Sequence, residues 1–149
     1  MNLREDKGYT YGARSFFSFK RGVGAFGVAT GVNTDVTAPA ISEILNELET
    51  IRTQDVSPKE LSNAQNYYSL SLPGYFQTVN GIASMFSNIY TYDLPMNYYQ
   101  ELPHKLGKVT IADIRRVAQS ILKPENLAIV VVGDKNTVAP TLKELGRGK

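Results

Sequence analysis

The sequence predicts an α+β fold in which an antiparallel or mixed sheet carries helices on one face. Three observations support this prediction. The chain begins with two alternating segments joined by a short glycine-containing loop, which is the pattern of a β-hairpin. Several segments with helical spacing and helix-start signals follow, and a short apolar run near the end predicts one more strand. Strands and helices are therefore segregated along the chain.

The hairpin is predicted from the alternation of side chains. Residues 9–20 place most of their aromatic side chains on one face, and residues 25–33 alternate in the same way. Arg21 and Gly22 supply the turn between them, because glycine tolerates a positive φ. We expect two long, half-buried strands.

Six helical segments are expected, each from a signal at its ends. A hydroxyl cap and a proline at residues 37–39 begin the first, and Ser57 and Glu60 form a capping box around Pro58 that begins the second. The second should run towards Leu70 and stop before Pro73. The first and fifth helices should turn these residues inward: Ile41, Ile44, Leu45, Leu48 and Ile51, then Ile111, Ile114, Val117, Ala118 and Ile121. The other helices are expected over residues 78–90, 97–106 and 137–145, and the apolar run 127–132 is expected to be a central strand.

Length and composition predict one globular domain over residues 1–149. With 16 basic and 14 acidic residues the net charge is +2, which is too balanced to indicate a nucleic acid or an anionic membrane as partner. No apolar run approaches the roughly 18 residues that span a bilayer. Cysteine is absent, which excludes disulfides and leaves a periplasmic and a cytoplasmic location, for a bacterial protein, equally open.

The most informative stretch is residues 3–12, which place Arg4 and Tyr11 seven positions apart where the chain enters its first strand. Arginine offers five donors in a fixed fork and tyrosine offers one hydroxyl. Together they could hold a carbonyl that is becoming an oxyanion. The same spacing also arises by chance, with Arg4 paired to a surface carboxylate and Tyr11 packed in the sheet.

This stretch resembles the second, zinc-free half of the pitrilysin/insulinase-type zinc metallopeptidases, where an Arg-x6-Tyr pair reaches the active site of the first half. Arg4 and Tyr11 match that spacing. Further motifs follow in the family's order, among them Val56-Ser57-Pro58-Lys59-Glu60-Leu61, Tyr92-Asp93-Leu94-Pro95 and Val130-Val131-Val132-Gly133-Asp134. The resemblance implies a LuxS/MPP-like metallohydrolase fold and a single, partial second-half domain over residues 1–149. Family members usually have a strand and a helix upstream of this stretch, so we expect an N-terminally truncated fragment whose sheet has a bare edge.

The resemblance also implies a function, the substrate-binding, oxyanion-stabilising half of a zinc-dependent endopeptidase. The family holds zinc with His-x-x-Glu-His, and His104 is the only histidine of this sequence. Zinc is therefore expected in a partner half, on the same or a neighbouring polypeptide, and this chain alone should hold no metal or cofactor and be inactive. Arg4 and Tyr11 would act in trans on the carbonyl of a peptide substrate. Two alternatives stay open: a non-catalytic paralogue that serves as a scaffold or assembly subunit, and an unrelated binding module.

Three other features have structural explanations. The Gly-x-Gly-x-x-Gly run from Gly22 to Gly27 is better explained by the hairpin than by a dinucleotide site, so NAD and FAD are not predicted. His104 alone cannot make a zinc site, which takes three or four ligands. The nine tyrosines suit either a core with hydroxyls at its rim or an interface.

Overall fold

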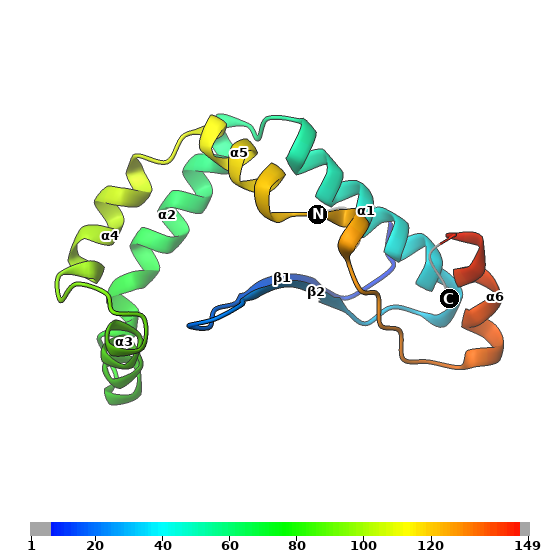
Figure 1. Ribbon diagram of the computed structural model, residues 1–149, viewed down its shortest axis with the longest axis horizontal. Coiled ribbons are helices and arrows are strands. Elements are labelled where there is room, and N and C mark those ends of the chain that lie inside the picture. The colour runs from blue at the N-terminus through cyan, green and yellow to red at the C-terminus, as the bar shows by residue number, and fades with distance from the viewer. Residues whose placement is uncertain (1–6, 147–149) are drawn as a thin grey trace. The chain divides into compact units, whose positions relative to one another are not determined.

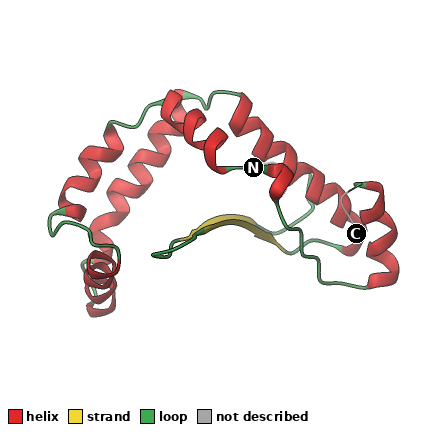
Figure 2. Cartoon of the chain, in the orientation of Figure 1, coloured by secondary structure: helices red, strands yellow, loops and turns green. Residues whose placement is uncertain are grey.

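The structure is a computed structural model that describes residues 7–146 (Figure 1). The described chain is α+β, with a two-stranded antiparallel sheet and six α-helices, so the predicted fold class is confirmed. Helices form most of it (Figure 2). The elements are β1 (Ala13–Ser18), β2 (Ala25–Thr30), α1 (Thr37–Thr53), α2 (Pro58–Tyr75), α3 (Val79–Thr91), α4 (Tyr98–Gly107), α5 (Ile111–Ile121) and α6 (Lys135–Glu144), with 3-10 turns at Thr34–Val36 and Pro124–Asn126.

The predicted hairpin is confirmed, with strands shorter than expected. β1 pairs with β2 in an antiparallel register that runs from Ala13 opposite Thr30 to Ser18 opposite Ala25. Glycine is required at the tight end of this hairpin. A Cβ on Gly24 would lie 2.8 Å from the carbonyl oxygen of Ser18, closer than real Cβ contacts allow.

The chain divides into two compact units. One unit, here called the sheet unit, comprises the chain up to Thr53 and from Gln119 onward. The other, the helical unit, comprises residues 54–118, so the boundary falls within α5. One domain over residues 1–149 stays a prediction.

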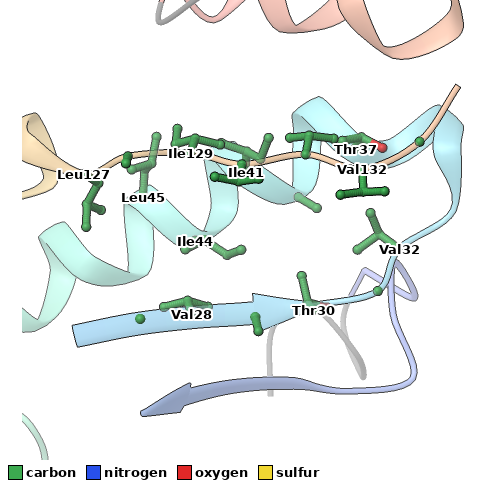
Figure 3. Close-up of a pocket in the computed structure, with 18 of the residues that line it drawn as sticks. Val28, Thr30, Val32, Thr37, Ile41, Ile44, Leu45, Leu127, Ile129 and Val132 are labelled. Atoms are coloured by element: carbon green, nitrogen blue, oxygen red, sulfur yellow. The ribbon is translucent and has the colours of Figure 1, made fainter. Parts of the chain in front are cut away.

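Within the sheet unit, the apolar stripe predicted for α1 is only partly confirmed, because Leu48 is buried whereas Ile41, Ile44, Leu45 and Ile51 are half-buried. Ile41, Ile44 and Leu45 line the pocket that Figure 3 shows. Ala38, Ala40 and Leu48 on α1 are buried, as is Val138 on α6.

The predicted hydroxyl cap differs from the observed one. The hydroxyl of Thr37 donates to the carbonyl of Thr34 at 2.9 Å, because a 3-10 turn runs directly into the helix and leaves Thr37 inside it.

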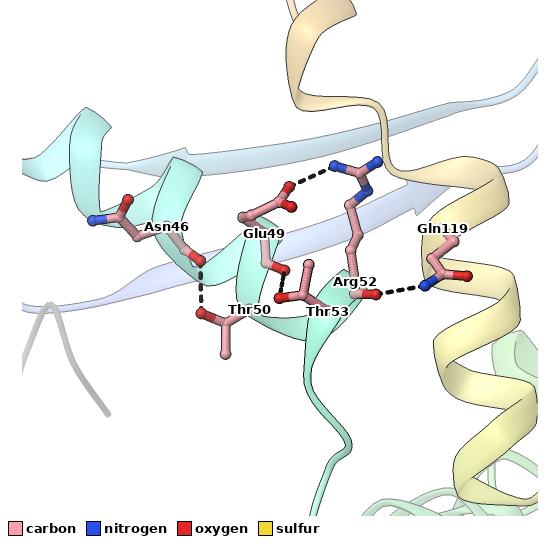
Figure 4. A network of polar contacts seen from close by, with 6 residues as sticks. All are labelled: Asn46, Glu49, Thr50, Arg52, Thr53 and Gln119. Atoms are coloured by element: carbon pink, nitrogen blue, oxygen red, sulfur yellow. Dashed lines mark hydrogen bonds and ion pairs between the residues drawn. The ribbon is translucent and has the colours of Figure 1, made fainter.

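The C-terminal end of α1 is held by local polar contacts (Figure 4). The hydroxyls of Thr50 and Thr53 each donate to a backbone carbonyl one turn earlier, at 2.8 Å. Arg52 forms an ion pair with Glu49. The side-chain amide of Gln119 donates to the carbonyl of Arg52 at 2.9 Å, which ties the last segment of the sheet unit to the end of α1.

The prediction of a central strand at 127–132 is wrong for the described structure. The segment is a loop in Figure 2, and no strand is assigned to it. Its start is extended, with Leu127 at φ −72° and ψ 132°, but a strand also needs a hydrogen-bonded neighbour. Among the described residues, no backbone hydrogen bond joins this segment to β1 or β2.

In the helical unit, α2 begins at the residue that its local sequence signal predicted but ends later than predicted. The capping box of α2 is present as predicted: the amide of Glu60 donates to the hydroxyl oxygen of Ser57 at 3.2 Å, and the amide of Ser57 donates to the Glu60 carboxylate at 2.8 Å. These bonds, first from the backbone and then from the side chain of Ser57, lower the pKa of Glu60. The predicted stop before Pro73 is wrong, because α2 continues through it to Tyr75. A proline removes the hydrogen bond of its own amide and crowds the carbonyl four residues earlier, but α2 ends within the same turn, so few helical bonds follow Pro73.

The next two helices begin and end within a residue or two of the prediction. Thr78 caps α3 by accepting from the amide of Gly81 at 3.0 Å. Gly81 is needed there, since a Cβ on it would lie 1.9 Å from the carbonyl oxygen of Tyr75. Between α2 and α4, the side-chain amide of Gln65 donates to the carbonyls of Leu106 and Val109 at 2.9 and 3.1 Å.

At the start of α5, Asp113 accepts from the hydroxyl of Thr110 at 2.7 Å and from its amide at 3.1 Å. The Thr110 hydroxyl, its amide and Arg116 together lower the pKa of Asp113 to about 2. The inward face predicted for α5 is only partly buried. Ala118 is buried, whereas Val117 and Ile121 are 39% and 52% exposed.

Candidate functional site

Tyr11 lies two residues before β1, at the position where the sequence placed a catalytic donor. Its side chain is 98% exposed, so Tyr11 does not pack in the sheet. No described residue forms a hydrogen bond with its hydroxyl, which leaves the phenol able to donate to a bound group. The other predicted site residue, Arg4, lies outside the described residues, so the pairing of Arg4 with Tyr11 stays a prediction.

The backbone on both sides of Tyr11 is fastened to the end of β2. The hydroxyl of Thr10 lies 2.6 Å from the carbonyl oxygen of Gly31 and accepts from the amide of Gly12 at 3.0 Å. The hydroxyl of Thr30 lies 2.9 Å from that of Thr10 and 3.1 Å from the carbonyl oxygen of Gly12. Each hydroxyl has one proton, so each donates to one of these acceptors at a time. The result is an exposed phenol on an anchored backbone.

Two structural features lie in the chain just before Tyr11. Gly8 has a φ of +64°, a left-handed conformation that glycine adopts without steric cost. The ammonium group of Lys7 lies 4.0 Å from the carboxylate of Glu43 on α1. This pair is partly exposed and contributes little stability.

The sequence did not predict this anchor. Thr10 and Thr30 are 20 residues apart, and neither belongs to a local motif. Their contact depends on the register of the hairpin, in which Ala13 lies opposite Thr30. A register prediction for the two strands could have found it.

Comparison with known proteins identifies the part of the chain that carries this site. Residues 1–68 match the family model of the Peptidase M16 inactive domain. The match covers 68 of the 149 residues of the chain. The resemblance to the zinc-free half of the insulinase-type peptidases is thereby confirmed over residues 1–68, which include Arg4 and Tyr11. No curated protein matches the chain.

M16 inactive domains pair with a catalytic half, so the match suggests the role of a peptidase partner half for this chain. The match covers the hairpin, α1 and the first part of α2. The motifs predicted after residue 68 lie outside it, and their assignment to the M16 pattern stays a prediction.

Side chains of the metal-binding types are not clustered in the described part of the chain. Over residues 7–146 no cluster of three or more histidine, cysteine, aspartate or glutamate side chains could hold a metal ion. His104 lies exposed on α4. The Gly-x-Gly-x-x-Gly run forms the hairpin turn and the first half of β2, as the alternation predicted, and no helix begins within it. Within the described residues, none of the helices has the length and apolarity needed to cross a membrane.

The aromatic residues of the helical unit lie largely at its surface. Tyr67, Tyr68 and Tyr90 are 70%, 62% and 84% exposed. Of the two explanations for the tyrosines, the exposed fractions of these three favour an interface over a core. Tyrosine suits such surfaces because it combines a rigid apolar ring with a hydroxyl that stays hydrated.

Proposed function

We propose that this chain is the substrate-binding, oxyanion-stabilising half of a zinc-dependent endopeptidase that degrades peptides. Its partner would be a half with His-x-x-Glu-His, on the same or a neighbouring polypeptide, and the zinc would be held there. One observation carries the proposal: Tyr11, which fits the Arg-x6-Tyr spacing of the resemblance, has a phenol that is 98% exposed on an anchored backbone.

In the partner half, zinc would activate water for attack on a peptide carbonyl. As the carbonyl oxygen gains negative charge, the Tyr11 hydroxyl and the Arg4 guanidinium would donate hydrogen bonds to it. Donors of this kind act mainly on the transition state, since the charge is fully developed only there. Their removal should therefore lower kcat and leave KM nearly unchanged.

The anchor at Thr10 supports the same role. A donor contributes most when its position is fixed before the reaction, because no energy is then spent on ordering it. The hydrogen bonds of Thr10 and Thr30 restrict the backbone next to Tyr11 while leaving its side chain accessible.

The experiment is a peptide-cleavage assay on the complex of this chain with its zinc-binding half, purified together. The assay is run with and without this chain, and each half alone should be inactive. Tyr11→Phe should reduce kcat by about 100- to 1000-fold, the usual cost of removing one oxyanion donor. The matched control is Tyr9→Phe, which removes a phenol hydroxyl two residues before Tyr11 and should leave kcat unchanged.

Two results would contradict the proposal in different ways. Wild-type turnover in Tyr11→Phe would remove Tyr11 from the mechanism while leaving the pairing of the halves intact. A stable complex without cleavage, formed with a half whose zinc motif is degraded, would instead favour the non-catalytic scaffold. Arg4→Lys separates charge from geometry, because lysine keeps the positive charge and loses the two-pronged donor.

A further inference from the structure

The first turn of α3 contains the one Asn-Gly step of the sequence, Asn80-Gly81. Asn80 is the second residue of the helix, and its side chain is exposed. Among the described residues, none forms a hydrogen bond with the side-chain amide of Asn80. An asparagine before glycine is chemically reactive, because glycine has no Cβ to shield its backbone nitrogen and reaches conformations that other residues avoid.

The fold requires glycine at the position after Asn80. A Cβ on Gly81 would run into the carbonyl oxygen of Tyr75, the last residue of α2. The same atom would lie 3.0 Å from the hydroxyl oxygen of Thr78. The packing of the start of α3 against the end of α2 therefore selects the residue that makes Asn80 reactive.

The closed helix holds the reacting atoms apart. The backbone amide of Gly81 donates to the Thr78 hydroxyl oxygen at 3.0 Å, and the amide of Ile82 donates to the Thr78 carbonyl oxygen at 3.0 Å. The Gly81 nitrogen has to lose its proton and turn towards the Asn80 side chain before it can react. Both changes require the Thr78 cap to open, and the opening of one terminal turn costs less than unfolding the whole unit.

We propose that Asn80 is a site of spontaneous deamidation and that opening of the Thr78 cap controls its rate. Once the turn is open, the Gly81 nitrogen gives its proton to water, and its electron pair forms a bond to the side-chain carbonyl carbon of Asn80. The bond between that carbon and the side-chain nitrogen breaks, and the nitrogen takes up a proton and leaves as ammonia. The product is a cyclic succinimide. Water then adds to either ring carbonyl and opens the ring, which gives aspartate or isoaspartate.

The two products should affect α3 in opposite ways. Aspartate would place a negative charge in a first turn that has no acidic residue, and such a charge stabilises a helix N-terminus. Isoaspartate adds a methylene group to the backbone and would disrupt the hydrogen bond between Thr78 and Ile82. Either product introduces a charge into residues 61–92, which have none in the sequence. This inference does not depend on the proposed role of Tyr11.

The test incubates the 149-residue chain at mildly alkaline pH and follows Asn80 by mass spectrometry. Chymotrypsin releases residues 77–86, in which Asn80 is the only asparagine, and fragmentation distinguishes aspartate from isoaspartate. We expect both products to accumulate, more slowly than in the same chain unfolded in guanidinium chloride. Asn88 is the internal control. It precedes the β-branched Ile89 and donates to the Tyr99 hydroxyl at 3.2 Å, so it should stay unmodified.

Two variants test the role of the cap. Thr78→Val removes the oxygen that accepts from Gly81 and should raise the rate at Asn80 by about fivefold, from the usual cost of a lost N-cap. The matched control Ser57→Ala removes the corresponding cap of α2 and should leave the rate unchanged.

Three results would overturn the proposal. The first is an unmodified Asn80 in the folded wild-type chain. The second is an equal rate in the folded and the unfolded wild-type chain, because the cap would then give no protection; this comparison needs no variant and stands even if Thr78→Val fails to fold. The third is an equal effect of Thr78→Val and Ser57→Ala, because global unfolding would then be the step that exposes Asn80.

Discussion

The substitution Thr30→Val tests whether the backbone beside Tyr11 is held in place by side-chain hydrogen bonds. Valine keeps the β-branched shape that suits β2 and removes the hydroxyl. That hydroxyl lies 2.9 Å from the Thr10 hydroxyl and 3.1 Å from the Gly12 carbonyl oxygen, and its one proton serves one of them at a time. One net hydrogen bond is therefore lost.

A hydrogen bond of this kind contributes about 0.5–1.5 kcal/mol. The lower half of that range applies, since the groups near Gly12 are exposed and water can replace the lost donor. A loss of about 0.5–1 kcal/mol raises the open population of this end of the hairpin about two- to fivefold, because 1.4 kcal/mol corresponds to a factor of ten.

The assay is amide hydrogen exchange at Gly12, whose amide donates to the Thr10 hydroxyl oxygen at 3.0 Å. Exchange at Gly12 should accelerate by about two- to fivefold in Thr30→Val. Thr50→Val removes an exposed hydroxyl that donates within α1 and should leave Gly12 unchanged. Identical exchange in wild type and Thr30→Val would refute the anchor, as would an equal acceleration in the Thr50→Val control.

Three further predictions concern the helical unit. Ser57→Ala should lower the free energy of unfolding in urea by about 1 kcal/mol, the usual cost of a lost N-cap, whereas Ser62→Ala on the exposed face of α2 should change it by less than about 0.5 kcal/mol. The Asp113 carboxyl has a pKa of about 2 in the folded chain against 3.8 in the unfolded chain, so the stability that it contributes is complete above pH 3.8 and is lost as the pH falls through 2. An NMR titration of this carboxyl should give a midpoint of about 2, and a midpoint near 3.8 would contradict the cap. Gly81→Ala should destabilise the chain by about 1–3 kcal/mol in thermal unfolding, because the added Cβ meets a backbone carbonyl even though alanine favours helices. The control Gly74→Ala, which has open space around its Cβ, should be neutral or stabilising, and equal effects of the two variants would contradict the steric reason.

The helix starts could be predicted from the sequence because the contacts that fix them are local. Ser57 and Glu60 are three residues apart, and their capping box needs no contact with distant parts of the chain. The stop of α2 was misplaced, since the strength of proline as a helix breaker depends on its distance from the helix end. Pro73 falls in the last turn, where few bonds remain to be broken.

The features that the sequence did not reveal depend on distant partners. The apolar run 127–132 has the composition of a strand, yet pairing requires a neighbour, and none is present among the described residues. The sheet of the described residues has the bare edge that we expected, because β2 pairs with β1 alone. The exposure of Tyr11 agrees with a role as donor, but the threonine anchor beside it depends on a register that local patterns leave open.

The order of synthesis follows from the way the two units divide the chain. The helical unit is one continuous stretch, whereas the sheet unit is assembled from two stretches that flank it. A ribosome therefore delivers residues 54–118 complete before the last part of the sheet unit has emerged. Helices with their own caps can form in the nascent chain at that stage, whereas α1 gains its contacts with α6 only after residues 135–144 have been made. The sheet unit therefore completes its packing after all of the helical unit has been synthesised.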